Sequence, residues 1–367
     1  MSGGRSASIF RLQEQSALAH HEIKHAIIGT IDGQDVDAYR LKGGDTEIEV
    51  MTYGAIMTRL TRPDSAGKVE DIVIGYDDPA SYVGNPGNAS AICGRLSNRL
   101  AYGKFSLDGV DYQLPTNSGP HHLHGGLPGF GKRFWRAEID EARNAVIFRL
   151  HSPDGDQGYP GALEATTTYR LDDDGALELT MEAVSDRATI ANIIYHGYWN
   201  LGGHGSGSVE DQILWIGADH YTKVTEEKIP TGEIVSVTGT PYDFTTAHRI
   251  GDHIAETWPG IGYDHNLCLS AYDGEMHLAA EAHDPATGRA MALYTNQPGV
   301  QLYTAAHYQA APTTGKDGVT YHAYAGFALE TQKYPDSPHH PNFPSVVLKA
   351  GEHYAHRMRF VFSTLPA

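Results

Sequence analysis

A carboxylate within an apolar stretch near the C-terminal end is the first candidate for chemistry in this sequence. Residues 327–329 (Phe-Ala-Leu) precede Glu330, and Pro335 ends the run, a pattern that predicts a short and mostly buried strand. A Glu is rarely buried without a partner, and desolvation raises its pKa toward neutrality, where a carboxylate is an effective general base. From this window alone, a Glu that faces water on the polar side of a strand fits equally well.

Histidines supply the next candidates. His196 lies in the stretch 193–201 between an aliphatic run and two aromatic residues, so it is either a satisfied core imidazole or a proton donor. His122 and His124 form an H-x-H pattern that, in a strand, places both imidazoles on one face at a spacing that metals use. No further residue with recognisable metal spacing is close in sequence. A histidine that donates a hydrogen bond to a neutral ligand is at least as reasonable.

Three polar clusters add candidate ligand-binding residues. Asn98 and Arg99 can hydrogen-bond ligand hydroxyls or pair with a carboxylate, although a surface turn that carries Arg95 and Arg99 is the simpler interpretation. Asp264 begins an Asp-His-Asn step before an apolar strand, which alone indicates an Asx turn. Gln301 lies inside an apolar strand, and a buried amide needs partners for both its oxygen and its nitrogen.

The composition limits the kinds of partner. The 367 residues include 45 acidic and 27 basic side chains, a formal charge of −18, which argues against nucleic acid and anionic membranes and favours a neutral ligand. Cys93 and Cys268 form neither a disulfide framework nor a metal motif. The sequence has no apolar segment of signal-peptide or membrane-helix length, so we expect a soluble, cytoplasmic protein.

Strand patterns dominate the elements that must position these residues. From Ala26 onward, short alternating segments are separated by turn residues, and 163–171 and Ala176–Val184 predict a hairpin around the turn 172–175. No sustained helical periodicity occurs in the body of the chain. We predict an all-β fold, a large antiparallel sandwich, with residues 23–367 as one domain and residues 1–22 as an arm that is loose or forms a short helix.

The motifs also occur together in a familiar order. The segments 95–100, 122–126, 196–201, 230–234, 262–269, 297–303 and 329–336 resemble those of the aldose 1-epimerases, or galactose mutarotases, from about Ile23 to Phe362. The resemblance implies a β-sandwich of the galactose mutarotase type, no cofactor and no metal. It implies that Glu330 is the general base and His196 the general acid. It further implies that sugar hydroxyls and the ring are bound by five residues: Asn98, Arg99, His124, Asp264 and Gln301.

The sequence departs from this family pattern at a few positions. Tyr195 stands where Asn is usual before the acid, Gly197 where Ser or Thr is usual after it, and Gly131 where Asp is frequent. The loop 305–321 is of a kind that varies across the family. These departures leave the acid and base in place and leave the preferred aldose open.

The implied reaction is the opening and closing of a cyclic hemiacetal, in which the C1 hydroxyl loses a proton while the ring oxygen gains one. We expect a monosaccharide as the partner, no nucleic acid or membrane, and a monomer or homodimer. Three other functions remain open: a glycoside hydrolase, a non-catalytic sugar-binding protein and a sugar-phosphate epimerase. A hydrolase would use Asp264 and Glu330, separated by roughly 5–5.5 Å for retention or 6.5–9.5 Å for inversion.

Overall fold

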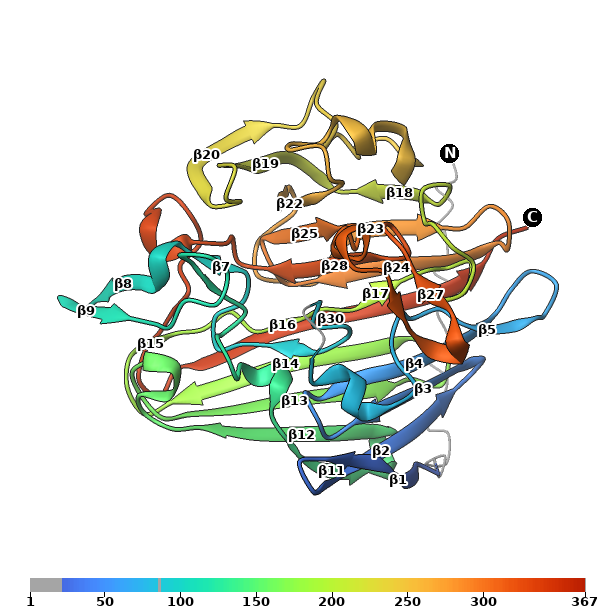
Figure 1. Cartoon of the computed structure of the whole chain (residues 1–367), viewed down its shortest axis with the longest axis horizontal. Coiled ribbons are helices and arrows are strands. Elements are labelled where there is room, and N and C mark those ends of the chain that lie inside the picture. The colour runs from blue at the N-terminus through green and yellow to red at the C-terminus, as the bar shows by residue number, and fades with distance from the viewer. Residues whose placement is uncertain (1–21, 85–86, 367) are drawn as a thin grey trace, which may run out of the picture.

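The protein is built from antiparallel strands in several sheets, as the computed structural model shows (Figure 1). The structure describes residues 22–84 and 87–366, so the predicted arm, with its short helix over Ile9–Leu18, lies almost wholly outside the described residues. Within the described part of the chain, α1 (His307–Ala310) is the only α-helix. No helix there is long and apolar enough to cross a membrane. The predicted all-β class is confirmed.

Three sheets hold most of the strand residues. The largest has nine strands in the order β11 (Arg136–Asp140), β12 (Ala145–Ser152), β13 (Leu163–Leu171), β14 (Leu177–Ser185), β30 (His353–Thr364), β24 (Arg289–Thr295), β23 (His277–His283), β18 (Ile213–Ile216) and β21 (His248–Arg249). A six-stranded sheet has the order β17 (Tyr198–Trp199), β28 (Phe327–Gln332), β25 (Gly299–Tyr303), β22 (Asp264–Leu269), β19 (Ala218–Val224) and β20 (Pro230–Ser236). A five-stranded sheet contains β1 (Lys24–Ile31), β2 (Gln34–Gly43), β3 (Thr46–Met51), β4 (Ile56–Pro63) and β5 (Val69–Asp71).

Short elements line the connections. Two-stranded pairs are formed by β10 (His122–Leu123) with β7 (Arg99–Leu100), β16 (Ile194–Tyr195) with β6 (Ile92–Cys93), β15 (Thr189–Ile190) with β29 (Val347–Leu348), β8 (Lys104–Leu107) with β9 (Val110–Gln113), and β26 (Thr313–Thr314) with β27 (Thr320–Tyr321). The 3-10 turns are η1 (Pro79–Tyr82), η2 (Ala101–Gly103), η3 (Phe130–Lys132), η4 (Glu141–Arg143), η5 (Asp156–Gly158), η6 (Ile250–Glu256), η7 (Lys316–Gly318) and η8 (Ser337–His339).

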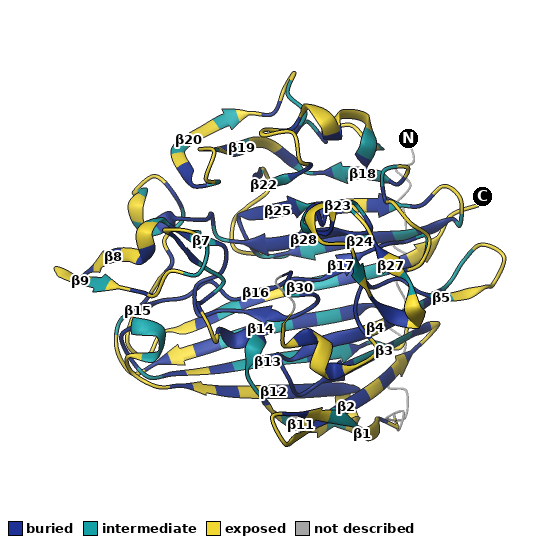
Figure 2. Cartoon of the chain, viewed as in Figure 1, coloured by how far each residue is buried: buried dark blue, intermediate teal, exposed yellow. Residues whose placement is uncertain are grey.

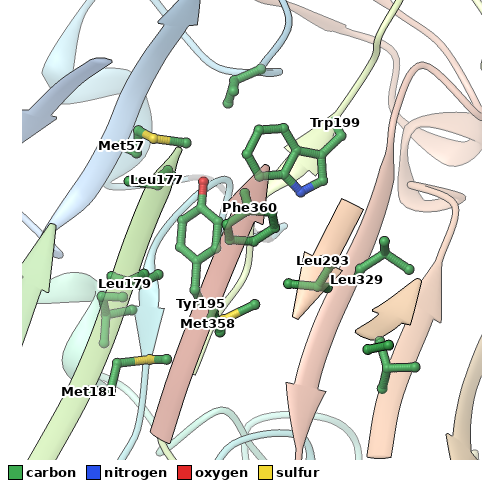
Figure 3. Close-up of a cluster of buried hydrophobic side chains, with 14 of the residues drawn as sticks. Met57, Leu177, Leu179, Met181, Tyr195, Trp199, Leu293, Leu329, Met358 and Phe360 are labelled. Atoms are coloured by element: carbon green, nitrogen blue, oxygen red, sulfur yellow. The ribbon is translucent and has the colours of Figure 1, made fainter. Parts of the chain in front are cut away.

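The predicted hairpin is present as β13 and β14. Leu171 pairs with Leu177 across the turn, and alternate residues of β14 are buried, as the alternating sequence requires. Leu177 and Leu179 are fully buried, and each such side chain contributes about 1.5–3 kcal/mol by leaving water. Together with Trp199 and Phe360 they belong to the large apolar core (Figure 3). This core is shared by residues of the five-, six- and nine-stranded sheets, which is the sandwich that the sequence predicts.

The six-stranded sheet has two buried faces, and this places Glu330. Every residue of β28 is buried, as the dark strands at the centre of the molecule show (Figure 2). Phe327 and Leu329 belong to the large core, and Ala328 to a separate apolar cluster. Since successive side chains of a strand point to opposite faces, Glu330 points away from the large core. The burial of this face therefore comes from the loops that cover the sheet.

Tyr195 and Gly197, the residues on either side of His196, fit each other sterically. The ring of Tyr195 lies in the large core, 6.4 Å from Trp199 and 6.4 Å from Phe360 between ring centroids. A Cβ added at Gly197 would lie 2.6 Å from the Tyr195 hydroxyl and still closer to its ring. A residue larger than Gly at 197 is therefore compatible only with a smaller side chain at 195.

We expect Gly197→Ala to lower the free energy of unfolding by about 1–3 kcal/mol, because it overpacks the core. The same change should cost much less in a Tyr195→Asn background, where the ring is gone. Urea denaturation of the four proteins of this double-mutant cycle measures the coupling. Purely additive costs would show that the two positions are independent.

Candidate active site

A small polar pocket lies on the outer face of the six-stranded sheet, where loops from the first half of the chain cover it. Its volume is about 100 Å³, and it is lined by Gly87, Asn88, Asn98, Arg99, Leu123, His124, His196, Tyr198, Asp264, Tyr303, His307 and Glu330. Six of the seven predicted site residues line this polar pocket. The seventh, Gln301, donates a hydrogen bond from Nε2 to Oδ1 of Asp264 at 2.7 Å. The structure therefore brings together all seven residues from positions 98 to 330.

Glu330 lies at the floor of the polar pocket. It sits opposite Gln301 in the β25–β28 register and is only 2% exposed. Burial raises its pKa well above the ordinary value; the negative charge of Asp264 adds to this, and the Arg99 guanidinium opposes it. Its Oε2 atom is buried and makes no hydrogen bond with the described residues. Such an unpaired atom costs about 1–3 kcal/mol, a cost that proteins retain at functional sites.

His196 lies in the bend between β16 and β17, and two hydrogen bonds of its own backbone hold this bend in place. Its N–H donates to the carbonyl of Ala91, and its carbonyl accepts the N–H of Ser90. The imidazole is 5% exposed, and Nε2 lies 3.5 Å from Oε1 of Glu330. The pKa of His196 is lowered to about 4, mainly by burial and to a smaller extent by the nearby His307, whereas Asp264 acts in the opposite direction. The fold thus brings a buried carboxylate and a buried imidazole together from positions that are 134 residues apart.

Asp264 is held ionised by three neighbours. Lys228 donates from Nζ to Oδ2 at 2.6 Å, Gln301 bonds Oδ1, and the Arg99 Nη1 lies 3.7 Å from Oδ2. Burial alone would raise the pKa of Asp264, but these cations and hydrogen bonds outweigh it and hold the pKa well below its usual range. The Asx turn that this segment alone indicates, the alternative to a binding role, does not form at Asp264. The residue is the first of β22, because its side chain is satisfied by distant partners rather than by its own backbone.

An amide network supports this arrangement beneath the polar pocket. Gln301 accepts at Oε1 from Nε2 of Gln332 at 3.2 Å, and the same Gln332 nitrogen donates to Oδ1 of Asn266 at 2.9 Å. Gln301 therefore has partners at both ends of its amide, as a buried amide requires. Side chains of β22, β25 and β28 fix one another, and they fix the orientation of Asp264.

The H-x-H pattern does not form a shared face, because the strand that this arrangement requires does not continue through His124. β10 ends at Leu123, and His124 adopts a φ of 49°, which breaks the strand alternation. His122 is turned away and buried, with Nε2 2.7 Å from the Tyr159 hydroxyl and Nδ1 2.6 Å from the Pro115 carbonyl. Gly125, with a φ of 82°, packs against the Gly94 carbonyl where a Cβ would collide. The turn therefore brings His124 alone into the polar pocket.

The orientation of His124 is set by the loop that carries Asn98. The backbone N–H of Asn98 donates to Nδ1 of His124 at 3.2 Å, and the backbone N–H of His124 donates to the Asn98 carbonyl at 3.1 Å. In the neutral imidazole that burial favours, Nε2 then carries the proton. His124, His196 and Glu330 lie close enough to hold a metal ion, with ligand atoms within 4.8 Å of one another. This tautomer instead makes His124 a hydrogen-bond donor, because its free nitrogen has no lone pair to offer a metal.

Arg95 is not the exposed residue of a surface turn. It is 1% exposed, and its guanidinium donates to the carbonyls of Pro160, Gly161 and Ser152. Such a buried arginine fixes the loop before β7, where Asn98 has a φ of 57°. The surface-turn interpretation of this segment is therefore wrong, and Arg95 positions the loop that presents Asn98 and Arg99.

Several residues of the site were not singled out from the sequence. Tyr198, Tyr303 and His307 line the polar pocket, and Lys228 binds Asp264 from the turn between β19 and β20. Strand alternation from Gln301 would have indicated Tyr303, and the aromatic run around His196 contains Tyr198. Lys228 and His307 have no such local signal. The Tyr303 hydroxyl lies 2.9 Å from Nδ1 of His307, whose buried Nε2 has no partner among the described residues.

Comparison with known proteins gives consistent matches. The family profile described as aldose 1-epimerase matches residues 37–361. The galactose mutarotase of Bos taurus is 39% identical over 328 residues, which cover 89% of this chain and 94% of the bovine protein. A solved aldose epimerase homologue from C. elegans has a TM-score of 0.82 at 28% identity, over 89% of this chain and 98% of that one. The galactose 1-epimerase of Lactobacillus acidophilus has a TM-score of 0.81 at 26% identity, over 94% and 99%.

Proposed function

The chain belongs to the aldose 1-epimerase family and interconverts the α and β anomers of an aldose, and we propose that Glu330 is its general base and His196 its general acid. One observation carries this assignment. The two side chains are buried in the same polar pocket, with 3.5 Å between His196 Nε2 and Glu330 Oε1. A carboxylate and an imidazole at that separation can both reach atoms bonded to one carbon.

The proposed reaction needs two proton transfers around the anomeric carbon. The carboxylate of Glu330 takes the proton of the C1 hydroxyl while the imidazolium of His196 protonates the ring oxygen. The bond between C1 and the ring oxygen breaks, and the electron pair of the C1 alkoxide forms the aldehyde. After rotation about C1–C2, the ring oxygen attacks the other face of the aldehyde. His196 takes its proton back, and Glu330 returns its proton to the new hydroxyl.

The proton that this cycle uses is shared by the pair. Burial disfavours charge on either side chain, so the empty pocket favours neutral His196 and protonated Glu330. The reactive form, with a carboxylate and an imidazolium, contains the same single proton in a different position. Its titration therefore belongs to the pair rather than to either residue.

We propose that four residues hold the sugar while the pair acts, and that a fifth residue orients one of them. Asn98, Arg99, His124, Asp264 and Gln301 surround the acid–base pair or bind one another beside it. Ionised Asp264 accepts hydrogen bonds from sugar hydroxyls, and Arg99 and the Nε2–H of His124 donate to sugar oxygens. Gln301 acts through Asp264, which it orients.

The charge distribution disfavours the alternative reactions. Both oxygens of Asp264 are engaged by Lys228, Gln301 and Arg99, so this carboxylate is poorly suited to act as the second catalytic group of a glycoside hydrolase. Asp264 also pairs with Arg99 and Lys228 and places a negative charge beside these cations, which disfavours a phosphate group there. A neutral aldose therefore fits the polar pocket best.

The charge, the cysteines and the core of the protein bear on its cellular location, its oligomeric state and its domain organisation. We propose that it acts in the cytoplasm as a monomer or homodimer, without nucleic acid or membrane as a partner. The acidic charge of −18 and the free, buried Cys93 and Cys268 support this proposal. We also propose that residues 23–367 form one domain, supported by the large core that strands from all three sheets share.

The pH dependence of mutarotation tests the acid–base assignment. We expect kcat/KM for freshly dissolved α-D-galactose or α-D-glucose, followed by polarimetry, to give a bell-shaped profile. On the acid side, activity falls near pH 4, where the pair gains a second proton because the pKa of His196 is lowered. On the alkaline side, it falls well above the ordinary carboxyl range, where Glu330 loses the shared proton.

Buffer-only rates at each pH provide the control, since free aldoses also mutarotate slowly by themselves. An acid limb near pH 6.5, the ordinary value for imidazole, would contradict the proposed burial of His196 in its working state. A protein that leaves all anomers at the buffer rate would overturn the function itself.

A further inference from the structure

A second and larger hollow lies on the other side of the sheet from the polar pocket. This aromatic cleft has a volume of about 610 Å³ and is lined by Tyr221, Lys223, Val224, Thr225, Glu226, Gly239, Thr240, Pro241, Tyr242, Glu256, Trp258 and His265. It lies by β19 and η6, which occupy the upper part of the view in Figure 1. It contains neither Glu330 nor His196, so the proposed mechanism does not use it.

The adjacent residues Asp264 and His265 show that the two sites lie on opposite faces of the sheet. Asp264 lines the polar pocket, whereas His265 lines the aromatic cleft. Successive side chains of a strand point to opposite faces, and both residues belong to β22. The sheet itself therefore stands between the two sites, and a molecule in the aromatic cleft cannot reach the acid–base pair.

The walls of the aromatic cleft are rigid rings. Tyr242 lies 4.6 Å from Tyr221 and 4.2 Å from His265 between ring centroids. The Tyr242 hydroxyl accepts the backbone N–H of Trp258 at 3.0 Å and lies 3.1 Å from Nε2 of His265. These bonds hold the aromatic surface in place before any ligand arrives, which lowers the entropy cost of binding.

One aromatic side chain stands open to solvent at the cleft. Trp258 is 52% exposed, whereas Trp135 and Trp199 are 2% and 1% exposed. Exposing an indole costs hydrophobic free energy, and an exposed indole that lines a cleft is a typical binding surface. Its flat face suits a ligand that has a flat apolar face of its own.

The rim of the cleft is polar and weakly acidic. Glu226, Glu256 and Lys223 line it, and Lys223 is paired with Glu233, 3.2 Å away. Carboxylates accept hydrogen bonds from hydroxyl groups and repel anions. A ligand for this cleft therefore combines a neutral charge, many hydroxyl groups and an apolar face.

We propose that the aromatic cleft is a non-catalytic saccharide-binding site, in which a pyranose ring packs on Trp258 and Tyr221 while its hydroxyls bond to Glu226 and Glu256. A pyranose is neutral, its C–H face supplies the apolar surface that packs on the aromatic rings, and its hydroxyls supply the hydrogen bonds to the carboxylates. This inference is independent of the roles assigned to Glu330 and His196, because the two sites share no residue.

The four tryptophans make a direct test possible. Indole ¹H–¹⁵N spectra of the whole protein contain one signal for each Trp, and Trp258→Ala identifies the signal of Trp258. The titrants are methyl β-D-glucopyranoside, methyl β-D-galactopyranoside and maltotriose; the two methyl glycosides cannot mutarotate. We expect a saturable shift of the Trp258 signal at millimolar concentrations of at least one of them. The shift should persist in Asp264→Asn, which disables sugar binding in the polar pocket only.

Calorimetry on variants completes the test. Trp258→Ala should weaken binding to the cleft at least tenfold, measured in the Asp264→Asn background, and should leave kcat/KM for mutarotation within twofold in an otherwise wild-type chain. Tyr272→Ala, which removes another exposed aromatic side chain outside the cleft, is the matched control and should change neither. The proposal is overturned if the Trp258 signal does not shift, shifts without saturation, loses its shift in Asp264→Asn, or responds to phenol but to no saccharide.

Discussion

Replacing Glu330 by Gln is expected to lower kcat for mutarotation by a factor of about 10²–10⁴, since one positioned proton-transfer group contributes that much. Gln keeps the shape of Glu and fits the same place in β28, but it cannot accept the C1 proton. Polarimetry of a fresh anomer measures the loss directly. Near wild-type activity in Glu330→Gln would remove this residue from the mechanism.

The same variant is expected to be more stable at alkaline pH. The pKa of Glu330 is raised in the folded protein, so the stability linked to its protonation is present below the pKa of the unfolded carboxyl and is lost as pH rises through the folded pKa. Gln carries no charge and loses nothing over that range. Thermal unfolding at pH 5 and pH 9 should therefore show a larger gain at pH 9. Glu138→Gln, an exposed change on β11, is the control and should alter neither activity nor this pH trend.

His196→Gln is expected to have an effect of similar size, about 10²–10⁴ in kcat, with KM changed by less than about threefold. The amide nitrogen of Gln can occupy the position of Nε2, 3.5 Å from Glu330, and can donate a hydrogen bond, but it cannot transfer a proton. The ring oxygen would then leave as an alkoxide without an acid.

The acid limb of the pH profile provides a second readout for His196. It should disappear in the residual activity of His196→Gln, because the group that takes up the second proton is gone. His151→Gln, an exposed histidine on β12, should leave rate and profile unchanged. If His196→Gln raised KM alone and kept kcat, His196 would be a binding residue rather than the acid.

The parts of the fold that follow local patterns could be predicted from the sequence. The β13–β14 hairpin and the buried strand around Glu330 have alternating or continuous apolar residues, and their burial follows from strand geometry. The proximity of Glu330 and His196 could not be predicted in this way. No local pattern joins them, and the expectation came from the resemblance to a family.

The errors share a physical cause: partners that are distant in sequence decided the local structure. A positive φ at His124 and the packing of Gly125 against Gly94 broke the strand that the H-x-H pattern needs. Asp264 joined a strand instead of a turn because Lys228 and Gln301 satisfy its carboxylate. The residues next to His124 and Asp264 in the sequence do not indicate either of these contacts.

The contact between Tyr195 and Gly197 constrains the evolutionary history of this site. A Tyr at 195 cannot coexist with any β-carbon at 197 without displacing one of them, whereas a Gly at 197 tolerates a small neighbour. If an ancestor carried the residues usual in the family, the mutation to Gly197 had to come before the mutation to Tyr195. Reversion would have to follow the opposite order, with Tyr195 lost before Gly197, so the contact fixes the order of the two substitutions in both directions.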